Sequence, residues 1–321
     1  MAKYKLGEIC EIVSGSTPKT GIAEYWDGNL KWITPAEIDD ESYIITDSAR
    51  KLTELGVKKT GLSSFPSGTV ILSSRAPIGK VAIAGCEMYC NQGFKNLICS
   101  DRINNRYLYW FLKGNTAYLN SLGRGATFKE ISKKIVSDIE INVPEISQQL
   151  AAVDALERVS EIIRLRKNQL QKLDELIKAR FVEMFGDCKS RVSMNELCSI
   201  ITDGTHQPPR FQESGIPFIF VSNLVGNVVT YNAEKFISED TYAELYKRTP
   251  IEIGDLLLST VGSYGHPAVV TEDRKFLFQR HIAYLKPRHN MVNSFYLHSA
   301  LLAPDGQRQI CLLYTSDAAD E

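Results

Sequence analysis

This chain of 321 residues lacks several features that would point directly to a class of function. Its 37 basic and 38 acidic residues give a net charge of −1, so no general excess of positive charge indicates a nucleic-acid-binding protein. No apolar run approaches the ~20 residues that a membrane-spanning helix needs. The first residues turn polar too early for a secretory signal. We therefore expect a cytoplasmic protein that involves no membrane and whose seven scattered cysteines stay reduced.

Motifs that carry chemistry are equally scarce. Residues 76–80 end in Gly-Lys, but they lack the first glycine and the Ser/Thr of a phosphate-binding loop. Residues 262–265 have the wrong spacing for a nucleophile elbow. Cys86 and Cys90 lack the second pair of ligands that a zinc site requires. We therefore expect no catalytic residue, no metal site and no cofactor in this chain.

The most informative feature that is present is an internal repeat. Three segments and two glycines recur 186 to 188 residues later: 6–12 as 194–200, 32–38 as 218–224, 91–93 as 278–280, Gly68 as Gly254, and Gly79 as Gly265. A nearly constant offset over five landmarks indicates a duplication. Two related globular units suit a ligand with two similar, separated sites, and duplex DNA is the obvious ligand of that kind.

Each copy begins with short β-branched segments bounded by Gly and Pro, and these predict strands. Helical segments follow, at 104–122 in the first copy and 294–302 in the second, and an alternating strand at 139–143 closes the first copy. The sequence thus predicts an α+β fold of two similar, mainly β domains, 1–144 and 187–310, joined by one long helix. The second domain is expected to be incomplete. Residues 311–321 match nothing in the first copy and resemble a translated sequencing adapter, so we expect a non-native tail there.

Residues 145–186 predict the long helix, because neither Gly nor Pro occurs between residues 145 and 185. A helix of this length spans about 60 Å. Its apolar residues follow steps of three, four and seven, which is typical of a seam that pairs with another helix: Leu156, Val159, Ile163, Leu170, Leu173, Ile177 and Met184. A core helix would need a broader apolar face. The sequence offers no second helix as long, so self-association of the chain through this seam is expected.

Basic and polar side chains gather locally despite the balanced total charge. Residues 158–180 hold seven basic and three acidic side chains. Polar loops recur at corresponding places in the two copies. Such side chains contact base edges and phosphates, although ordinary solvated loops share this composition. The candidate DNA contacts are Thr17, Lys19, Ser74, Arg75, Lys80, Gln92, Lys95, Arg124 and Lys129 in the first copy, and Thr205, His206, Gln207, Arg210, Tyr264, Gln279 and Arg280 in the second.

The end of the predicted helix, residues 173–187, closely resembles the central conserved region of the specificity subunits of type I restriction–modification systems. Further segments are similar to the target-recognition domains of that family: 32–35, 68–75, 78–82, 91–93 and 143–149. The resemblance covers residues 4–310. The chain departs from the family at its end, where a second long helix and the close of the second domain are missing.

The resemblance implies a non-catalytic subunit that reads a bipartite site in double-stranded DNA, one half with each domain. Two long helices would pair antiparallel and fix the gap. Two methylation subunits, which use S-adenosylmethionine, and ATP-driven restriction subunits would be its partners. S-adenosylmethionine, ATP and Mg are therefore expected on those partner subunits.

Two alternatives remain open at this point. The chain could be a fragment of an enzyme, either an adenine-specific DNA methyltransferase or a nuclease. Residues 206–210 partly match the N-P-P-[YF] motif of amino-methyltransferases, but no Gly-rich cofactor loop precedes them. It could also be a scaffold built around a coiled coil without DNA. Intrinsic methyl transfer and DNA binding at low and moderate salt distinguish these possibilities.

Overall fold

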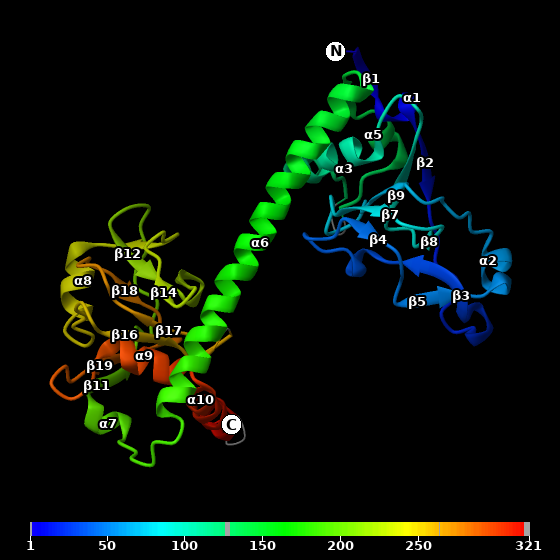
Figure 1. Cartoon of the computed structure of the whole chain (residues 1–321). Coiled ribbons are helices and arrows are strands. Elements are labelled where there is room, and N and C mark those ends of the chain that lie inside the picture. Colours follow the sequence, from blue (N-terminus) through cyan, green and yellow to red (C-terminus); the bar gives the residue numbers. More distant parts are fainter. Residues whose placement is uncertain (1, 126–128, 263, 318–321) are drawn as a thin grey trace. The chain divides into compact units, whose positions relative to one another are not determined.

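The computed structural model describes residues 2–125, 129–262 and 264–317, with side chains up to residue 311. The chain divides into two compact units, residues 1–166 and 167–321. Helix α6, Ile146–Phe185, runs for 40 residues and contributes to both (Figure 1). The predicted fold class, a long helix between two β-rich domains, is confirmed.

The first unit contains two sheets. The larger has the strand order β2-β9-β6-β7-β4, formed by Cys10–Ser14, Lys95–Cys99, Val70–Leu72, Val81–Ala84 and Ile44–Ile45. The smaller has the order β5-β3-β8, formed by Arg50–Leu52, Trp26–Ile33 and Tyr89–Cys90. A separate antiparallel pair joins β1, Ala2–Lys5, to β10, Glu140–Val143. The two ends of this domain are therefore hydrogen-bonded to each other just before α6 begins.

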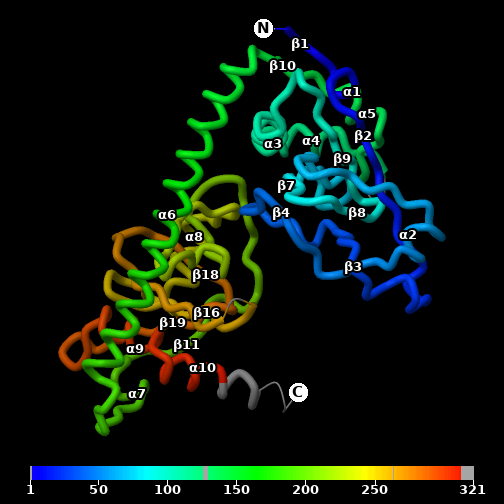
Figure 2. Tube along the Cα trace, turned by 45° about the vertical axis from the view of Figure 1, so that its right-hand side comes forward, coloured from blue at the N-terminus to red at the C-terminus, as the bar shows by residue number. Residues whose placement is uncertain are grey.

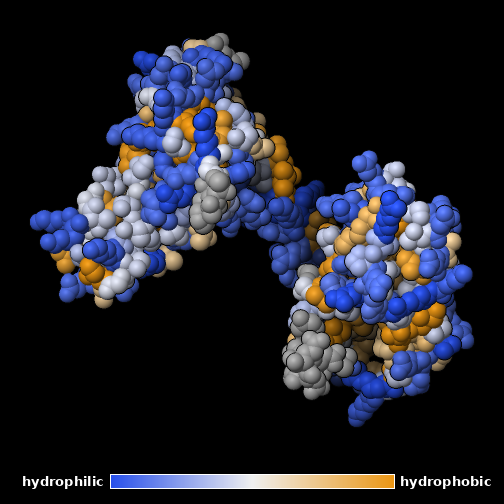
Figure 3. All heavy atoms as spheres, turned by 180° about the vertical axis from the view of Figure 1, so that it is seen from behind, coloured by the Kyte–Doolittle hydropathy of each residue, from blue (hydrophilic) through white to orange (hydrophobic). Residues whose placement is uncertain are grey.

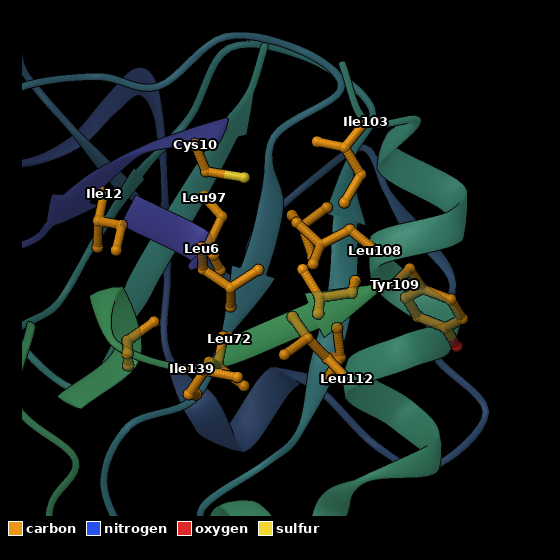
Figure 4. Packing of buried hydrophobic residues seen from close by; sticks show 14 of the residues in the cluster. Leu6, Cys10, Ile12, Leu72, Leu97, Ile103, Leu108, Tyr109, Leu112 and Ile139 are labelled. Atoms are coloured by element: carbon orange, nitrogen blue, oxygen red, sulfur yellow. The ribbon is translucent and has the colours of Figure 1, made fainter. Parts of the chain in front are cut away.

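Short helices surround these sheets: α1 Leu6–Ile9, η1 Ala23–Tyr25, η2 Pro35–Glu37, α2 Glu54–Thr60, α3 Asn105–Gly114, α4 Thr116–Leu122 and α5 Lys133–Ser137. Helix α3 packs against β6 and β7 (Figure 2). Figure 4 shows how Leu108 and Leu112 of α3 meet apolar side chains from α1 and the sheet in the core of this unit. Burial of that apolar surface is the main stabilising contribution to the first unit.

Gln149 fixes the start of α6 to the first unit and is completely buried. Its Nε2 donates to the carbonyl oxygens of Pro144 (2.8 Å) and Arg102 (3.1 Å). Its Oε1 accepts a hydrogen bond from the backbone N–H of Asn104, 2.8 Å away. One amide thus satisfies three backbone groups from two segments of the chain.

The second unit repeats this plan. Its larger sheet has the order β11-β19-β16-β17-β14-β13, formed by Cys198–Asp203, Ile282–Pro287, Leu256–Ser259, Pro267–Val269, Val228–Val229 and Leu224–Val225. Its smaller sheet has the order β15-β12-β18, formed by Phe236–Ile237, Ile216–Ile219 and Leu277–Phe278. Its helices are α7 Met194–Leu197, η3 Val221–Asn223, α8 Glu239–Leu245, α9 Ser294–Leu302 and α10 Pro304–Asp317.

The turn between the two central strands is closed by the same hydrogen bond in both units. Ser73 Oγ accepts the backbone N–H of Lys80 at 2.9 Å, and Ser259 Oγ accepts that of His266 at 2.9 Å. The residue before each of these, Gly79 or Gly265, has a φ of +91° or +80°, a conformation that only glycine adopts without strain. Positions 80 and 266 are therefore structurally equivalent, at the predicted offset of 186.

One landmark of the predicted repeat was aligned wrongly by one residue. The sequence pairs Gln92 with Gln279. In the structure, Cys90 lies opposite Ile33 on β3, and Phe278 lies opposite Ile219 on β12. Residue 278 therefore corresponds to residue 90, and Arg280 corresponds to Gln92. The reason is a connection before β18 that is two residues longer than the one before β8.

The two units differ at their ends. Within the described part of the chain, β1, β10 and α5 have no counterpart in the second unit. Helix α10 begins where the repeat places α4, and it continues through the first residues of the predicted tail to Asp317. Residues 318–321 of that tail lie outside the described residues. Among the described residues, no helix combines the length and apolar character required to cross a membrane.

Candidate nucleic-acid interface

In the first unit, three loops that follow β3, β6 and β8 surround a hollow of about 410 Å³. Three of the predicted DNA contacts line it: Arg75, Lys80 and Gln92. Thr17 reaches Gln92 from the loop after β2, and its hydroxyl donates to Gln92 Oε1 at 2.5 Å. The structure thus brings together four residues that are up to 75 positions apart in the sequence.

Two tryptophans hold the loop that carries Thr17 and Lys19. Trp32 Nε1 donates to the carbonyl oxygen of Ser16 at 3.1 Å, and Trp26 Nε1 donates to that of Lys19 at 3.3 Å. The Arg50 guanidinium stacks on Trp26, 3.5 Å from the ring centroid. Buried indole rings are thereby placed so that their N–H groups find partners on the loop.

A carboxylate beside the hollow, that of Glu130, forms ion pairs with two basic side chains of the candidate set. Glu130 contacts Arg75 Nε at 2.9 Å and Lys95 Nζ at 3.3 Å. Partial burial alone would raise the pKa of Glu130, but the hydrogen bonds and charges of Arg75 and Lys95 outweigh it and lower that pKa below its usual value. Lys95 is only 7% exposed, and its ammonium also donates to buried Ser74. Lys95 and Ser74 therefore lie beneath the surface.

The remaining two candidates of the first unit, Arg124 and Lys129, precede Glu130 in the chain. Arg124 exchanges two backbone hydrogen bonds with Glu130, of 3.0 and 2.9 Å, and both Arg124 and Lys129 are exposed. Residues 126–128, which connect them, lie outside the described residues. The exposed basic side chains of this segment thus stand next to the Arg75–Glu130 pair.

In the second unit, the corresponding loop is held by ion pairs instead of indoles. Asp203 contacts His206 Nε2 at 2.6 Å and Arg248 Nη2 at 2.7 Å. The backbone frame is preserved, because Thr205 N donates to the Phe278 oxygen as Ser16 N does to the Cys90 oxygen. The same loop position is thus stabilised by different chemistry in the two units.

The other predicted contacts of the second unit lie on adjacent loops. Arg280 is exposed, and its backbone N–H donates to the Thr205 oxygen at 3.1 Å. Gln279 is half-buried beside Thr205, whereas Gln207 and Arg210 are exposed. The Tyr264 hydroxyl lies 3.5 Å from Cys311 Sγ, so this side chain contacts helix α10.

Sequence reasoning missed Glu130, Asp203, Arg248 and the two tryptophans. A lone acid within the basic stretch 124–134, and an acid three residues before His206, were the available signals. No signal in the sequence pointed to Arg248, because its partner Asp203 is 45 residues away.

The predicted seam of α6 is exposed along its whole length. Exposed fractions run from 44% for Leu156 to 64% for Leu170, and the same range includes Val159, Ile163, Leu173, Ile177 and Met184. Figure 3 shows apolar residues at the surface as orange patches between hydrophilic areas in blue. Within the second unit, the last turns of α6 pack on α9 through Phe181 and Phe185, whose rings lie 5.4 and 5.1 Å from that of Tyr296.

A second hollow, of about 230 Å³, lies between α6, α9 and β17 in the second unit. His298 lines it, and burial lowers the pKa of this imidazole. Its Nε2 is buried without a hydrogen-bond partner among the described residues. No group of metal-ligating side chains occurs in the part of the chain that the structure describes.

Comparison with known proteins gives a consistent picture. The profile of the type I restriction modification DNA specificity domain matches residues 1–175. The type I restriction enzyme MjaIX specificity subunit of Methanocaldococcus jannaschii is 34% identical over 261 residues, 73% of this chain and 60% of the relative. The EcoBI specificity subunit of Escherichia coli is 25% identical over 236 residues, 64% of this chain and 50% of the relative. The chain thus spans only part of the length of these curated relatives.

Two solved structures share the fold. The S subunit of a type I restriction–modification system from M. genitalium aligns over 99% of this chain and 80% of its own, with a TM-score of 0.50 and 14% identity. A chain from a structure of type I R-M complex assembly aligns over 95% of this chain and 80% of its own, with a TM-score of 0.54 and 21% identity. With its duplicated domains, its long helix and the matching profile, this chain belongs to the family of type I restriction modification DNA specificity domains.

Proposed function

We propose that this chain is the sequence-recognising subunit of a type I restriction–modification complex, and that each unit reads one half of a bipartite DNA target. The observation that carries the proposal is the duplicated loop frame. Equivalent backbone positions hold Thr17 and Gln92 in one unit and His206 and Arg280 in the other. A common frame with different hydrogen-bonding groups suits two related readers of two different base sequences.

The proposed contacts fall into two groups. The exposed or half-buried side chains of the candidate set would meet DNA directly: Thr17, Lys19, Arg75, Lys80, Gln92, Arg124, Lys129, Thr205, His206, Gln207, Arg210, Tyr264, Gln279 and Arg280. Ser74 and Lys95 are buried and would act by positioning Glu130 and Arg75. Phosphate contacts in the first group would make binding strongly dependent on salt.

The exposed seam of α6 would pair with a second long helix, from further chain or from another copy. An unpaired apolar stripe of this kind favours self-association. We propose that the chain works in a cytoplasmic complex with two methylation subunits and with restriction subunits, as the resemblance to the family implies. These partners would supply the chemistry together with S-adenosylmethionine, ATP and Mg, and this chain would bind no cofactor and catalyse no step.

The test combines this chain with the methylation subunits encoded beside it. We expect methylation at one bipartite motif, and a footprint of two protected stretches separated by a gap. Light scattering should detect self-association of the isolated chain. A single uninterrupted footprint would contradict the two-reader arrangement. Methyl transfer by the isolated chain with S-adenosylmethionine would instead favour an enzyme, and absence of DNA binding at low salt would favour a scaffold.

A further inference from the structure

The hollow of the first unit is lined by neutral residues apart from two cations. Among the described residues that line it, only Arg75 and Lys80 are charged. No carboxylate is among the described residues that line it. Glu130 contacts Arg75 but does not itself line the hollow. An electropositive concavity of this kind attracts an anionic group.

Both cations keep donors available. Lys80 Nζ donates to the Pro35 carbonyl oxygen at 3.2 Å, which uses one of its three N–H bonds. Arg75 uses Nε for Glu130, and its two terminal nitrogens make no hydrogen bond to the described residues. The end-on fork of the guanidinium, the arrangement that binds phosphate oxygens in pairs, is therefore available.

The backbone fixes where these donors lie. Ser73 Oγ accepts Lys80 N at 2.9 Å and donates to the Pro77 oxygen at 2.7 Å. Asn120 Nδ2 holds the Ile78 oxygen at 2.9 Å. The loop that carries Arg75 and Lys80 is thus tied at several points, so little ordering cost remains when a ligand binds.

We propose that this hollow binds a phosphate of the DNA backbone through Arg75 and Lys80. The assignment rests on the proposed function and gives these two residues a role that positions the duplex without reading its sequence. Two cations with unused donors in an otherwise neutral lining match an anion that protrudes from the duplex. The neighbouring Thr17–Gln92 pair, which is neutral, is left for base edges.

The second unit lacks this site although it keeps the frame. The turn fixes Val261 as the equivalent of Arg75 and His266 as the equivalent of Lys80, since Ser259 Oγ accepts His266 N at the same 2.9 Å. The chain therefore offers its own matched control. A phosphate clamp at this place belongs to the first unit alone.

The experiment measures affinity of the full chain, in complex with its methylation subunits, for two duplexes over a series of KCl concentrations. One duplex carries the target and the other does not. Arg75→Gln and Lys80→Gln should each weaken binding of both duplexes equally, roughly tenfold at low salt. Each should reduce the slope of log affinity against log salt by about 1. Lys59→Gln, an exposed lysine on α2, should change neither quantity.

The converse variant introduces the two basic side chains into the second unit and tests whether they create a phosphate contact there. Val261→Arg combined with His266→Lys should steepen the salt slope by up to about 2. Unchanged slopes in Arg75→Gln and Lys80→Gln would overturn the inference, as would losses confined to the target duplex, which would mean base reading. Circular dichroism and thermal unfolding of each variant must match those of the unsubstituted chain. If Arg75→Gln or Lys80→Gln misfolds, the salt slope of the Val261→Arg, His266→Lys variant decides whether the inference holds. If the unsubstituted complex binds neither duplex, the proposed function itself fails.

Discussion

The two units place equivalent loops on the same backbone frame but hold them with different interactions. In the first unit, indole N–H groups and the buried Lys95, paired with the half-buried Glu130, hold the loops. In the second, one carboxylate, Asp203, bridges two side chains that are 51% and 54% exposed. Buried hydrogen bonds retain their strength because water does not compete, whereas exposed ion pairs are weakened by solvent and salt. The duplication thus preserved the frame while the interactions that stiffen it diverged.

The largest effect expected from this difference concerns the two bridging carboxylates. Glu130→Gln leaves the Lys95 ammonium, whose side chain is 8% exposed, without its counter-charge. We expect a loss of about 2 kcal/mol in the free energy of unfolding. Asp203→Asn removes the same kind of bridge from exposed partners and should cost about 0.5 kcal/mol. Urea denaturation of both variants measures this, and equal losses would refute the comparison.

A smaller effect is expected from the indole that holds the first loop. Trp32→Phe keeps a buried ring but removes the donor to the Ser16 oxygen. The loss should be about 1 kcal/mol in unfolding free energy, with faster hydrogen exchange at the Ser16 amide. Trp110→Phe is the matched control, because Trp110 Nε1 is buried without a partner among the described residues. A cost for Trp110→Phe as large as that for Trp32→Phe would show that ring packing, not the donor, is responsible.

The contribution of the Glu130 bridge to the free energy of unfolding should depend on pH. The folded pKa of Glu130 lies below its unfolded pKa, so this carboxyl stabilises the fold fully above the unfolded value. The contribution is lost as the pH falls through the lower, folded pKa. Glu130→Gln should therefore be less sensitive to acid than the unsubstituted chain over that interval. Parallel stability curves for the two proteins would argue against a charged Glu130 in the folded state.

The smallest effect is the response of the loops to salt. Raising ionic strength should speed hydrogen exchange in residues 204–212, which depend on the Asp203 ion pairs, and leave residues 15–19 nearly unchanged. Mass-spectrometric hydrogen exchange at two salt concentrations resolves the two peptides. An equal response of both loops would remove the distinction between them.

Much of the fold could be predicted from periodicity, turn residues and the repeat. The predicted helix 294–302 coincides with α9, because Asn293 accepts the backbone N–H groups of Phe295 and Tyr296 at its start. The long helix was evident from 40 residues without a helix breaker. These features depend on local chemistry, which neighbouring residues reveal.

The interface was less accessible to prediction because it depends on contacts between distant segments. Lys95 resembles a surface cation in the sequence, yet it is buried because Ser74 and Glu130 supply its partners from 21 and 35 residues away. The register of β18 shifted because a connecting loop is longer, and loop length does not alter any local pattern. Which candidate side chains contact DNA stays a prediction.

The buried amide of Gln149 has a consequence for which substitutions this family member can tolerate. Two carbonyl oxygens and one backbone N–H converge on it, so the side chain must donate twice and accept once at a fixed reach. Glutamate would face the two carbonyls with negative oxygens, methionine would leave all three groups unsatisfied, and asparagine is one methylene too short. Position 149 should therefore be among the least mutable in a saturation library.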